Sequence, residues 1–466
     1  MLKRMTFSHR TYDYMNIRIL WLAATLLISG SVFAKPSAAQ EIRRLSLADA
    51  VAEARGNHPH VAIAGAAAVG ARQQARIAGA GRWPTLGAEA GLMASSDPVA
   101  AFGARLRQGR FTEADFDPAR LNDPEAITDF DAAVALGWTP FDFSRDAALT
   151  AARAGADAAD LGAVWARRVA GYQAEIRYLE AAAAELLLES AEASLEAAEV
   201  NLDQVERHAA EGMLTEADVL QARAALEDAR LRGITAGQGV DDARSRLALA
   251  LGWPSHVVPV PDTDALALSD AAPEAPMDSG RADLEASEAR VRQASAHVKQ
   301  ADLSRMPKLQ ASARLEAHAD GGFSEQGDSW TVGVRMSVPL FTGFEIGARR
   351  AAARAELDIA RLEHDRMLDE AHAALAEARR AAESRRSGAA AAEAAAEAAL
   401  EAARLMRLRH GEGLVTTAEL LAVESAATRH AATAVQARLR HRIAAASLLL
   451  LDAPALNAFS REGVDR

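Results

Sequence analysis

Four segments of the chain alternate between apolar and polar residues with a period of two, as expected for β-strands with two unlike faces. They lie at about 85–95, 129–140, 309–319 and 330–340. In the third, every second residue from Leu309 to Ala317 is apolar, and Arg314 and Glu316 lie between them. Each segment is about 10 residues long, which is the length of a bilayer-crossing strand. A barrel with lipid outside and water inside requires this alternation, and a half-buried sheet of a soluble protein shows it too.

Four strands are too few to close a membrane barrel, which needs about 8. An open sheet edge would leave unpaired amides in lipid, so several copies of the chain must share one barrel. Three copies give about 12 strands around a hydrated lumen, whereas two give about 8, whose interior side chains largely fill. On the polar face, Arg314, Glu316 and Arg335 would line the lumen. These charges fit either a selectivity function or an ordinary hydrated interior.

Two long stretches space their apolar residues by three and four, the pattern of a left-handed coiled coil. They include residues 169–200 and 368–382, and many of their seam residues are alanine. Neither stretch contains proline, so each helix can run roughly 65 residues, or about 100 Å. In each half, the helix that runs back alongside the continuous one is in two pieces. The pieces are at 215–251 and 281–303 in the first half, and at 416–451 and 45–80 in the second. This predicts stacked helices beside continuous ones.

The mature chain is an internal duplication. Glu211-Gly212-Met213-Leu214-Thr215 in the first half corresponds to Glu412-Gly413-Leu414-Val415-Thr416 in the second. We expect a first repeat at 40–252 with a helical turn near 212, and a second at 281–453 with a turn near 413. A proline-rich linker at 253–280 joins them, and 454–466 form a tail. Residues 95–128 form a long polar connection, as extracellular barrel loops do.

The first residues are typical of an export signal. Lys3 and Arg4 precede an apolar run from Ile19 to Ile28, and cleavage is expected after Ala34 or Ala39. This predicts a signal peptide over residues 1–34, or to 39. The run is shorter than the roughly 18–20 residues of a spanning helix, so membrane entry would need a β-barrel. The chain has no cysteine, which excludes disulfides and the acylated cysteine of a lipoprotein.

Composition and motifs argue against several other functions. A net charge of -12 does not suit nucleic-acid binding. No phosphate loop, nucleophile elbow or zinc helix is present, so we predict no enzyme, no cofactor and no metal site. His208 and His410 are expected to be exposed at helix C-termini, where positive charge is favourable, rather than metal ligands. His58 and His60 flank Pro59 and are expected in a surface turn.

The chain resembles the TolC-like outer-membrane efflux channels over nearly all of its mature length. The most specific local feature is the strand-to-helix junction Ser337-Val338-Pro339-Leu340-Phe341-Thr342-Gly343, after which the family often has a second glycine in place of Phe344. The resemblance implies a mixed α and β fold. In this fold, a trimer shares one 12-stranded transmembrane barrel, four strands per protomer, continuous with a long α-helical coiled-coil tunnel in the periplasm.

The implied function is the outer-membrane exit channel of a tripartite efflux pump in a Gram-negative bacterium. Such a channel passes drugs, metals or other toxic small molecules from an inner-membrane pump, through a periplasmic adaptor protein, to the outside. The protein would be a homotrimer in outer-membrane lipid, exported by its signal peptide and not lipidated. It would meet the inner-membrane pump indirectly or at the tips of the helical tunnel.

The resemblance also implies functions for the two helical turns. Family members dock their adaptor at hairpin tips, which correspond here to Gly212, Met213, Leu214 and Thr215 and to Gly413, Leu414, Val415 and Thr416. Glu419 takes the place of an aspartate in the family's acidic ring at the narrow end of the tunnel, and Asp218 matches an acidic position after the first tip. Both carboxylates equally suit a helix N-terminus. The arginine that ties the family's tips closed corresponds to Val415.

Two other interpretations are kept open by the sequence. One is the exit duct of a type I protein secretion system. The other is a periplasmic coiled-coil structural protein without a pore, which does not explain four alternating strands at matched positions of a duplication. The sequence identifies neither the cargo nor the class of pump, whether of RND, ABC or MFS type.

Overall fold

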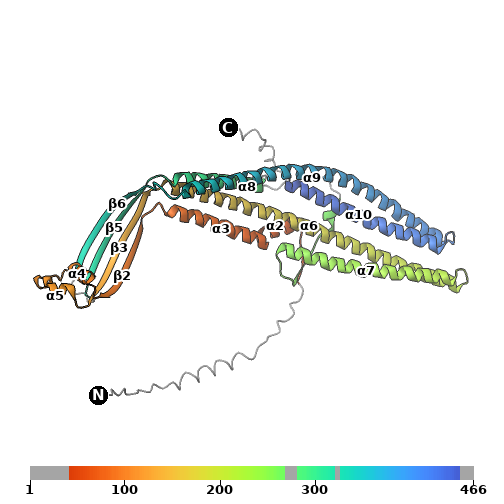
Figure 1. Ribbon diagram of the computed structural model, residues 1–466. Coiled ribbons are helices and arrows are strands. Elements are labelled where there is room, and N and C mark those ends of the chain that lie inside the picture. Colours follow the sequence, from red (N-terminus) through yellow and green to blue (C-terminus); the bar gives the residue numbers. More distant parts are fainter. Residues whose placement is uncertain (1–40, 268–280, 321–325, 452–466) are drawn as a thin grey trace, which may run out of the picture.

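A computed structural model describes residues 41–267, 281–320 and 326–451. It shows a long wall of helices with a curved four-stranded sheet at one end (Figure 1). The expected signal peptide, the expected C-terminal tail and part of the expected linker lie outside the described residues. The mostly helical architecture with one sheet agrees with the mixed α and β class expected from the sequence.

The sheet is antiparallel, with the strand order β2-β3-β5-β6. Its strands are β2 (Thr85–Ser95), β3 (Ile127–Phe141), β5 (Lys308–Ala319) and β6 (Gln326–Ser337). The fourth strand was expected to end near residue 340, but it ends at Ser337 because Pro339 has no amide hydrogen for the ladder. In β3 the pairing register shifts between Trp138 and Phe141, where Pro140 likewise has no amide hydrogen for the ladder.

The pairing register separates the two faces of the sheet. One row across the four strands is Leu86, Leu136, Ala313 and Val332. Most of the large apolar side chains of this face are exposed, among them Leu86, Leu315 and Trp330. A row on the opposite face is Glu89, Ala133, Glu316 and Ser329. The sheet therefore has a largely uncovered apolar face and a face of mostly small, polar and charged residues.

Two continuous helices run the length of the wall: α6 (Phe143–Ala210, 68 residues) and α9 (Glu345–Gly411, 67 residues). Each is about 100 Å long. The interrupted return paths consist of α7 (Glu216–Leu251) with α8 (Ala282–Leu303), and of α10 (Thr417–Leu451) with α2 (Leu47–Asn57) and α3 (Pro59–Ala80). Near the sheet the lateral order is α3-α6-α8-α9, and toward the tips it is α7-α6-α10-α9.

The stretch 45–80 was expected to be one helical piece, and the structure breaks it at His58. Pro59 cannot continue the hydrogen-bond ladder and instead begins α3, with the Nδ1 atom of His58 accepting from the His60 amide at 3.2 Å. His58 is buried, so the expectation of a surface turn is wrong for this residue. The reason is packing, since the Gly252 turn lies directly against the backbone of Asn57 and His58.

The junction from β6 to α9 turns through two left-handed residues, Gly343 (φ 61°) and Phe344 (φ 68°). This conformation is easy for glycine and costly for a residue with a side chain. It gives a physical reason why a second glycine suits this position. The Phe344 ring packs edge-on against Phe341, with 5.6 Å between centroids.

The connection 95–128 was expected to be a loop, and the structure places three short helices in it. These are α4 (Pro98–Arg107), the 3₁₀ helix η1 (Glu113–Phe116) and α5 (Pro118–Asn122). They lie at the end of the sheet away from the long helices (Figure 1). We call residues 96–126 the outer insert.

A belt crosses the middle of the helical wall. Strands β1 (Glu41–Arg44) and β4 (Val257–Val260) pair in parallel, and the 3₁₀ helix η2 (Thr263–Leu266) follows. The side chain of Tyr178 on α6 is fully buried beneath them. Its hydroxyl donates to the Leu45 carbonyl at 3.0 Å and accepts from the Asp262 amide at 2.7 Å. Tyr178 thus ties the segments that follow β1 and β4 to the continuous helix.

Among the helices of the described ranges, none combines the length and the apolar character that crossing a bilayer requires.

Replacing Tyr178 with phenylalanine should lower the free energy of unfolding by about 1–3 kcal/mol, because two buried backbone groups lose their partner. Denaturant unfolding followed by helical circular dichroism measures this. The matched control is Tyr172→Phe, since Ser447, the partner of Tyr172 at 2.6 Å, also donates to the Ile443 carbonyl. If both variants lowered the free energy of unfolding equally, the belt contact would contribute no more to stability than the Tyr172 contact.

Candidate functional site: the helical tips and the polar sheet face

Both long helices end in a tight turn built on a left-handed glycine. Gly212 has a φ of 79° and Gly413 a φ of 71°. The following amides bond back to the helix, Met213 to the His208 carbonyl at 2.9 Å and Leu414 to the Arg409 carbonyl at 3.0 Å. This geometry ends a helix within one turn. It leaves Met213 62% and Leu414 68% exposed at the two tips.

A capping box begins each return helix. The Asp218 carboxylate accepts from the Thr215 hydroxyl at 2.6 Å and amide at 2.9 Å. The Glu419 carboxylate accepts from the Thr416 amide and hydroxyl, both at 2.9 Å. These hydrogen bonds lower the pKa of both carboxyl groups, so both are ionised at neutral pH. Capping is therefore one function of both residues. Glu419 remains exposed to solvent, and Asp218 is half-buried.

His410, in the last turn of α9 before the second tip, lies near His208 and Asp218 beside the first tip. This residue is only 4% exposed, and its Nε2 atom lies 3.5 Å from the hydroxyl of the buried Thr417. Burial lowers the pKa of His410, and the nearby His208 lowers it further. The expectation of an exposed histidine is thus wrong for His410, because packing between the tips covers it. In the part of the chain that the structure describes, no three His, Cys, Asp or Glu residues are grouped to hold a metal ion.

On the polar sheet face, the structure brings two of the expected lumen residues together. The Arg314 guanidinium pairs with Glu316 on the same strand and reaches Glu89 of β2 at 3.2 Å. Arg335 lies apart from them, opposite Gln310 toward the helical end of the sheet, and is exposed. The charges on this face therefore include both a paired cluster and a separate arginine.

A buried polar cluster at the outer end of the sheet was missed by the sequence analysis. The Gln108 side-chain amide donates to the Asp129 carboxylate at 2.9 Å, and the other oxygen of Asp129 lies 3.1 Å from Nδ1 of His318. All three side chains are buried. They come from the outer insert, β3 and β5, so no local sequence pattern connects them.

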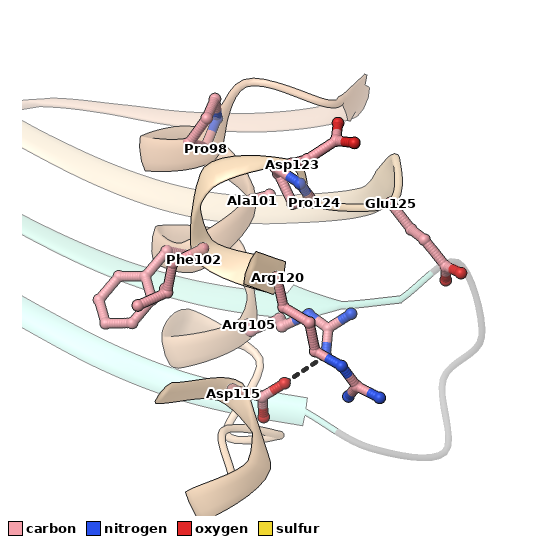
Figure 2. Close-up of a pocket in the computed structure, with 10 residues that line it drawn as sticks. Pro98, Ala101, Phe102, Arg105, Asp115, Arg120, Asp123, Pro124 and Glu125 are labelled. Carbon is pink, nitrogen blue, oxygen red and sulfur yellow. Dashed lines mark hydrogen bonds and ion pairs between the residues drawn. The ribbon is translucent and has the colours of Figure 1, made fainter. Parts of the chain in front are cut away.

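The outer insert has a small hollow of its own, between α4, η1 and α5. Figure 2 shows Phe102, Arg105, Arg120 and Asp115 around it, with Arg105 bonded to Asp115 at 2.6 Å. The ion pair joins α4 to η1. The hollow is therefore part of the way the insert folds on itself.

Comparisons with known proteins agree with this architecture. The sequence profile of the outer membrane efflux protein family matches residues 50–253 and 278–453. Protein CyaE of Bordetella pertussis is 30% identical over 368 residues, which cover 73% of each chain.

Solved structures are similar in fold at lower identity. The outer membrane protein VceC of Vibrio cholerae has a TM-score of 0.71 at 22% identity, over 87% of this chain and 96% of that one. The CmeC outer membrane channel of Campylobacter jejuni has a TM-score of 0.73 at 16% identity, over 87% and 85%.

Proposed function

The chain belongs to the outer membrane efflux protein family, and from this premise we propose that it is the exit channel of a tripartite efflux pump. The resemblance to TolC-like channels is confirmed by the family and by the fold. The protein is an outer membrane channel and not an enzyme. In the proposal, three copies in the outer membrane of a Gram-negative bacterium carry small toxic molecules from an adaptor and an inner-membrane pump to the outside.

The observation that carries the proposal is a pair of open edges that continues from the sheet into the helices. Strands β2 and β6 are the outer strands of the sheet. On the β2 side the wall ends at α3 and α7, and on the β6 side it ends at α9. Backbone groups at a sheet edge must be paired in lipid, so β6 of one copy would pair with β2 of the next. Three copies close a barrel of about 12 strands.

Exposed apolar residues on the same edges support this closure. Ile63 and Ile77 are exposed on α3, and Ile359 and Leu362 on α9. Burial of such side chains between copies would stabilise the trimer by about 25 cal/mol per Å² of apolar area. The exposed apolar face of the sheet would meet outer-membrane lipid, and the opposite face would line a hydrated lumen. In this arrangement Arg314, Glu316 and Arg335 face the passing solutes.

The tips are proposed as the place where the periplasmic adaptor docks. Each presents an exposed apolar side chain, Met213 or Leu414, on a turn held by a left-handed glycine. Rigid exposed apolar groups of this kind suit a protein interface. The neighbouring residues of both tips, from Gly212 to Thr215 and from Gly413 to Thr416, complete the proposed surface. The pump would be reached through the adaptor or at these tips.

Glu419 and Asp218 are proposed to form the periplasmic gate. Both are ionised, Glu419 is exposed and Asp218 half-buried, and each lies in the first turn after a tip. Three copies of each around a narrow opening would attract cations. The proposal keeps the two repeats at 40–252 and 281–453, the linker at 253–280 and the export signal at 1–34 or 1–39, without lipidation or cofactor.

The direct test is the mass of the purified protein in detergent together with its single-channel conductance in a planar bilayer. We expect a trimer that gives small, discrete conductance steps, because the lumen is continuous and its periplasmic end is narrow. A monomer or dimer without conductance would contradict the shared barrel and favour a periplasmic coiled coil without a pore.

Leu414→Arg should abolish efflux in cells while trimers still reach the outer membrane, because a buried unpaired charge at the adaptor interface is costly. Leu414 is a better test position than Gly413, because any side chain at Gly413 would also strain the left-handed turn. Ile42→Arg, an equally exposed apolar residue of the belt, is the matched control and should leave efflux intact. Normal efflux with Leu414→Arg would show that the tips do not dock.

Glu419→Gln separates the gate from the helix cap. Glutamine keeps the capping hydrogen bonds and removes the charge, so block by multivalent cations from the periplasmic side should weaken severalfold while trimer stability is unchanged. Glu401→Gln, farther up α9 in an exposed pair with Arg404, is the control and should not alter the block. Undiminished block in Glu419→Gln would leave Glu419 with capping alone.

A further inference from the structure

We propose that the outer insert lies inside the lumen and narrows the outer mouth of the channel, so that it limits the size of solute that passes. This inference rests on the proposed function, because it takes the polar face of the sheet as the lumen face. It assigns a selectivity element to residues 96–126, a segment that the strand and helix patterns leave unexplained.

The first observation is where α4 ends. Gly327 of β6 pairs with His318 of β5, which lies on the same face as Glu316 and Arg314 because side chains alternate along a strand. A Cβ atom added to Gly327 would point to this face and lie 1.8 Å from the carbonyl oxygen of Arg107. The last turn of α4 therefore presses directly against the polar face, and only glycine at 327 allows this approach.

The second observation is how the insert is anchored. Gln108, the residue after α4, is buried and donates to the Asp129 carboxylate and to the Thr128 carbonyl, both at 2.9 Å. Asp129 lies on the polar face, two residues before Asp131. Its other oxygen lies 3.1 Å from His318 and 3.8 Å from Arg107. A buried carboxylate with several partners is costly to separate from them, so the anchor holds the insert in place.

The third observation is that the insert has its own internal packing. Phe102, Phe111 and Phe116 stack edge-on in series, with centroid distances of 4.9 and 5.1 Å. Arg105 and Asp115 join α4 to η1 in the hollow of Figure 2. The insert is thus a folded unit and not a flexible loop. Around a closed barrel, three such units on the inner face occupy the space through which solute must leave.

The absence of cysteine allows a direct test by single-cysteine labelling in intact cells. Thr331→Cys places a thiol on the polar face of β6, deeper than Gly327, and Val332→Cys places one on the apolar face beside it. The probes are maleimides that carry polyethylene glycol chains of increasing length, added from outside. The comparison chain has Asn-Gly in place of residues 96–126, a two-residue turn that fits because Ser95 and Ile127 are already paired.

We expect Thr331→Cys to react with a small maleimide in both chains. A long-chain maleimide should react at least an order of magnitude faster once the insert is removed. Equal rates with long-chain probes, with and without the insert, would overturn the constriction while the channel itself stands. If Val332→Cys reacts with small maleimide as fast as Thr331→Cys, or Thr331→Cys does not react, the face assignment and with it the proposed barrel fail.

If the shortened chain does not assemble into trimers, a point variant tests the same proposal. Gly327→Ala forces the Arg107 carbonyl off the sheet and should raise labelling of Thr331→Cys by long-chain probes. Gly333→Ala is the matched control on the same strand and face, where the new methyl group meets only the Ser312 hydroxyl at 3.6 Å. Trimers in the outer membrane with unchanged labelling in Gly327→Ala would contradict the constriction.

Discussion

The requirement that every backbone amide in lipid has a hydrogen-bond partner governs the assembly that we propose for this chain. One chain supplies a sheet of four strands with two unpaired edges, and such a sheet cannot lie in a bilayer alone. The helical wall is also open on two sides, because α3 and α7 continue one edge of the sheet and α9 continues the other. In the proposed trimer, this wall, open on matching sides from end to end, is one sector of a closed tube.

The helical wall depends on small side chains. Ala50, Ala54 and Ala174 are fully buried around Tyr178, where α2 crosses α6 beneath the belt. Small residues at helix contacts let the backbones approach closely and curve, but they bury little apolar area each. Polar contacts therefore have a larger part in holding the middle of the wall, and the hydroxyl of Tyr178 is the clearest of them.

Much of the fold was predictable from the period of the apolar residues, because strand faces and helix seams are local patterns. Alternation located all four strands, and the start of β2 and the tips at Gly212 and Gly413 agree closely with the structure. The helices of the outer insert were missed although Asp97-Pro98 and Asp117-Pro118 each supply a cap followed by proline at the first helical position. Burial of His410 and the Gln108–Asp129–His318 cluster depend on contacts between distant segments, which one sequence does not display. The gate function of Glu419 stays a prediction, since its capping box and its solvent-exposed edge suit both roles.

The uninterrupted run of α6 past the belt makes it a lever. From Tyr178 to the end of the helix at Ala210 the rigid arm is about 50 Å long at 1.5 Å per residue. A tilt of only one degree at the belt then moves the tip by about 1 Å, and a tilt of a few degrees moves it by more than the width of a water molecule. Slight rearrangements among the alanines at the belt are thereby amplified at the tip of α6, which borders the periplasmic opening in the proposed channel, without any helix having to unfold.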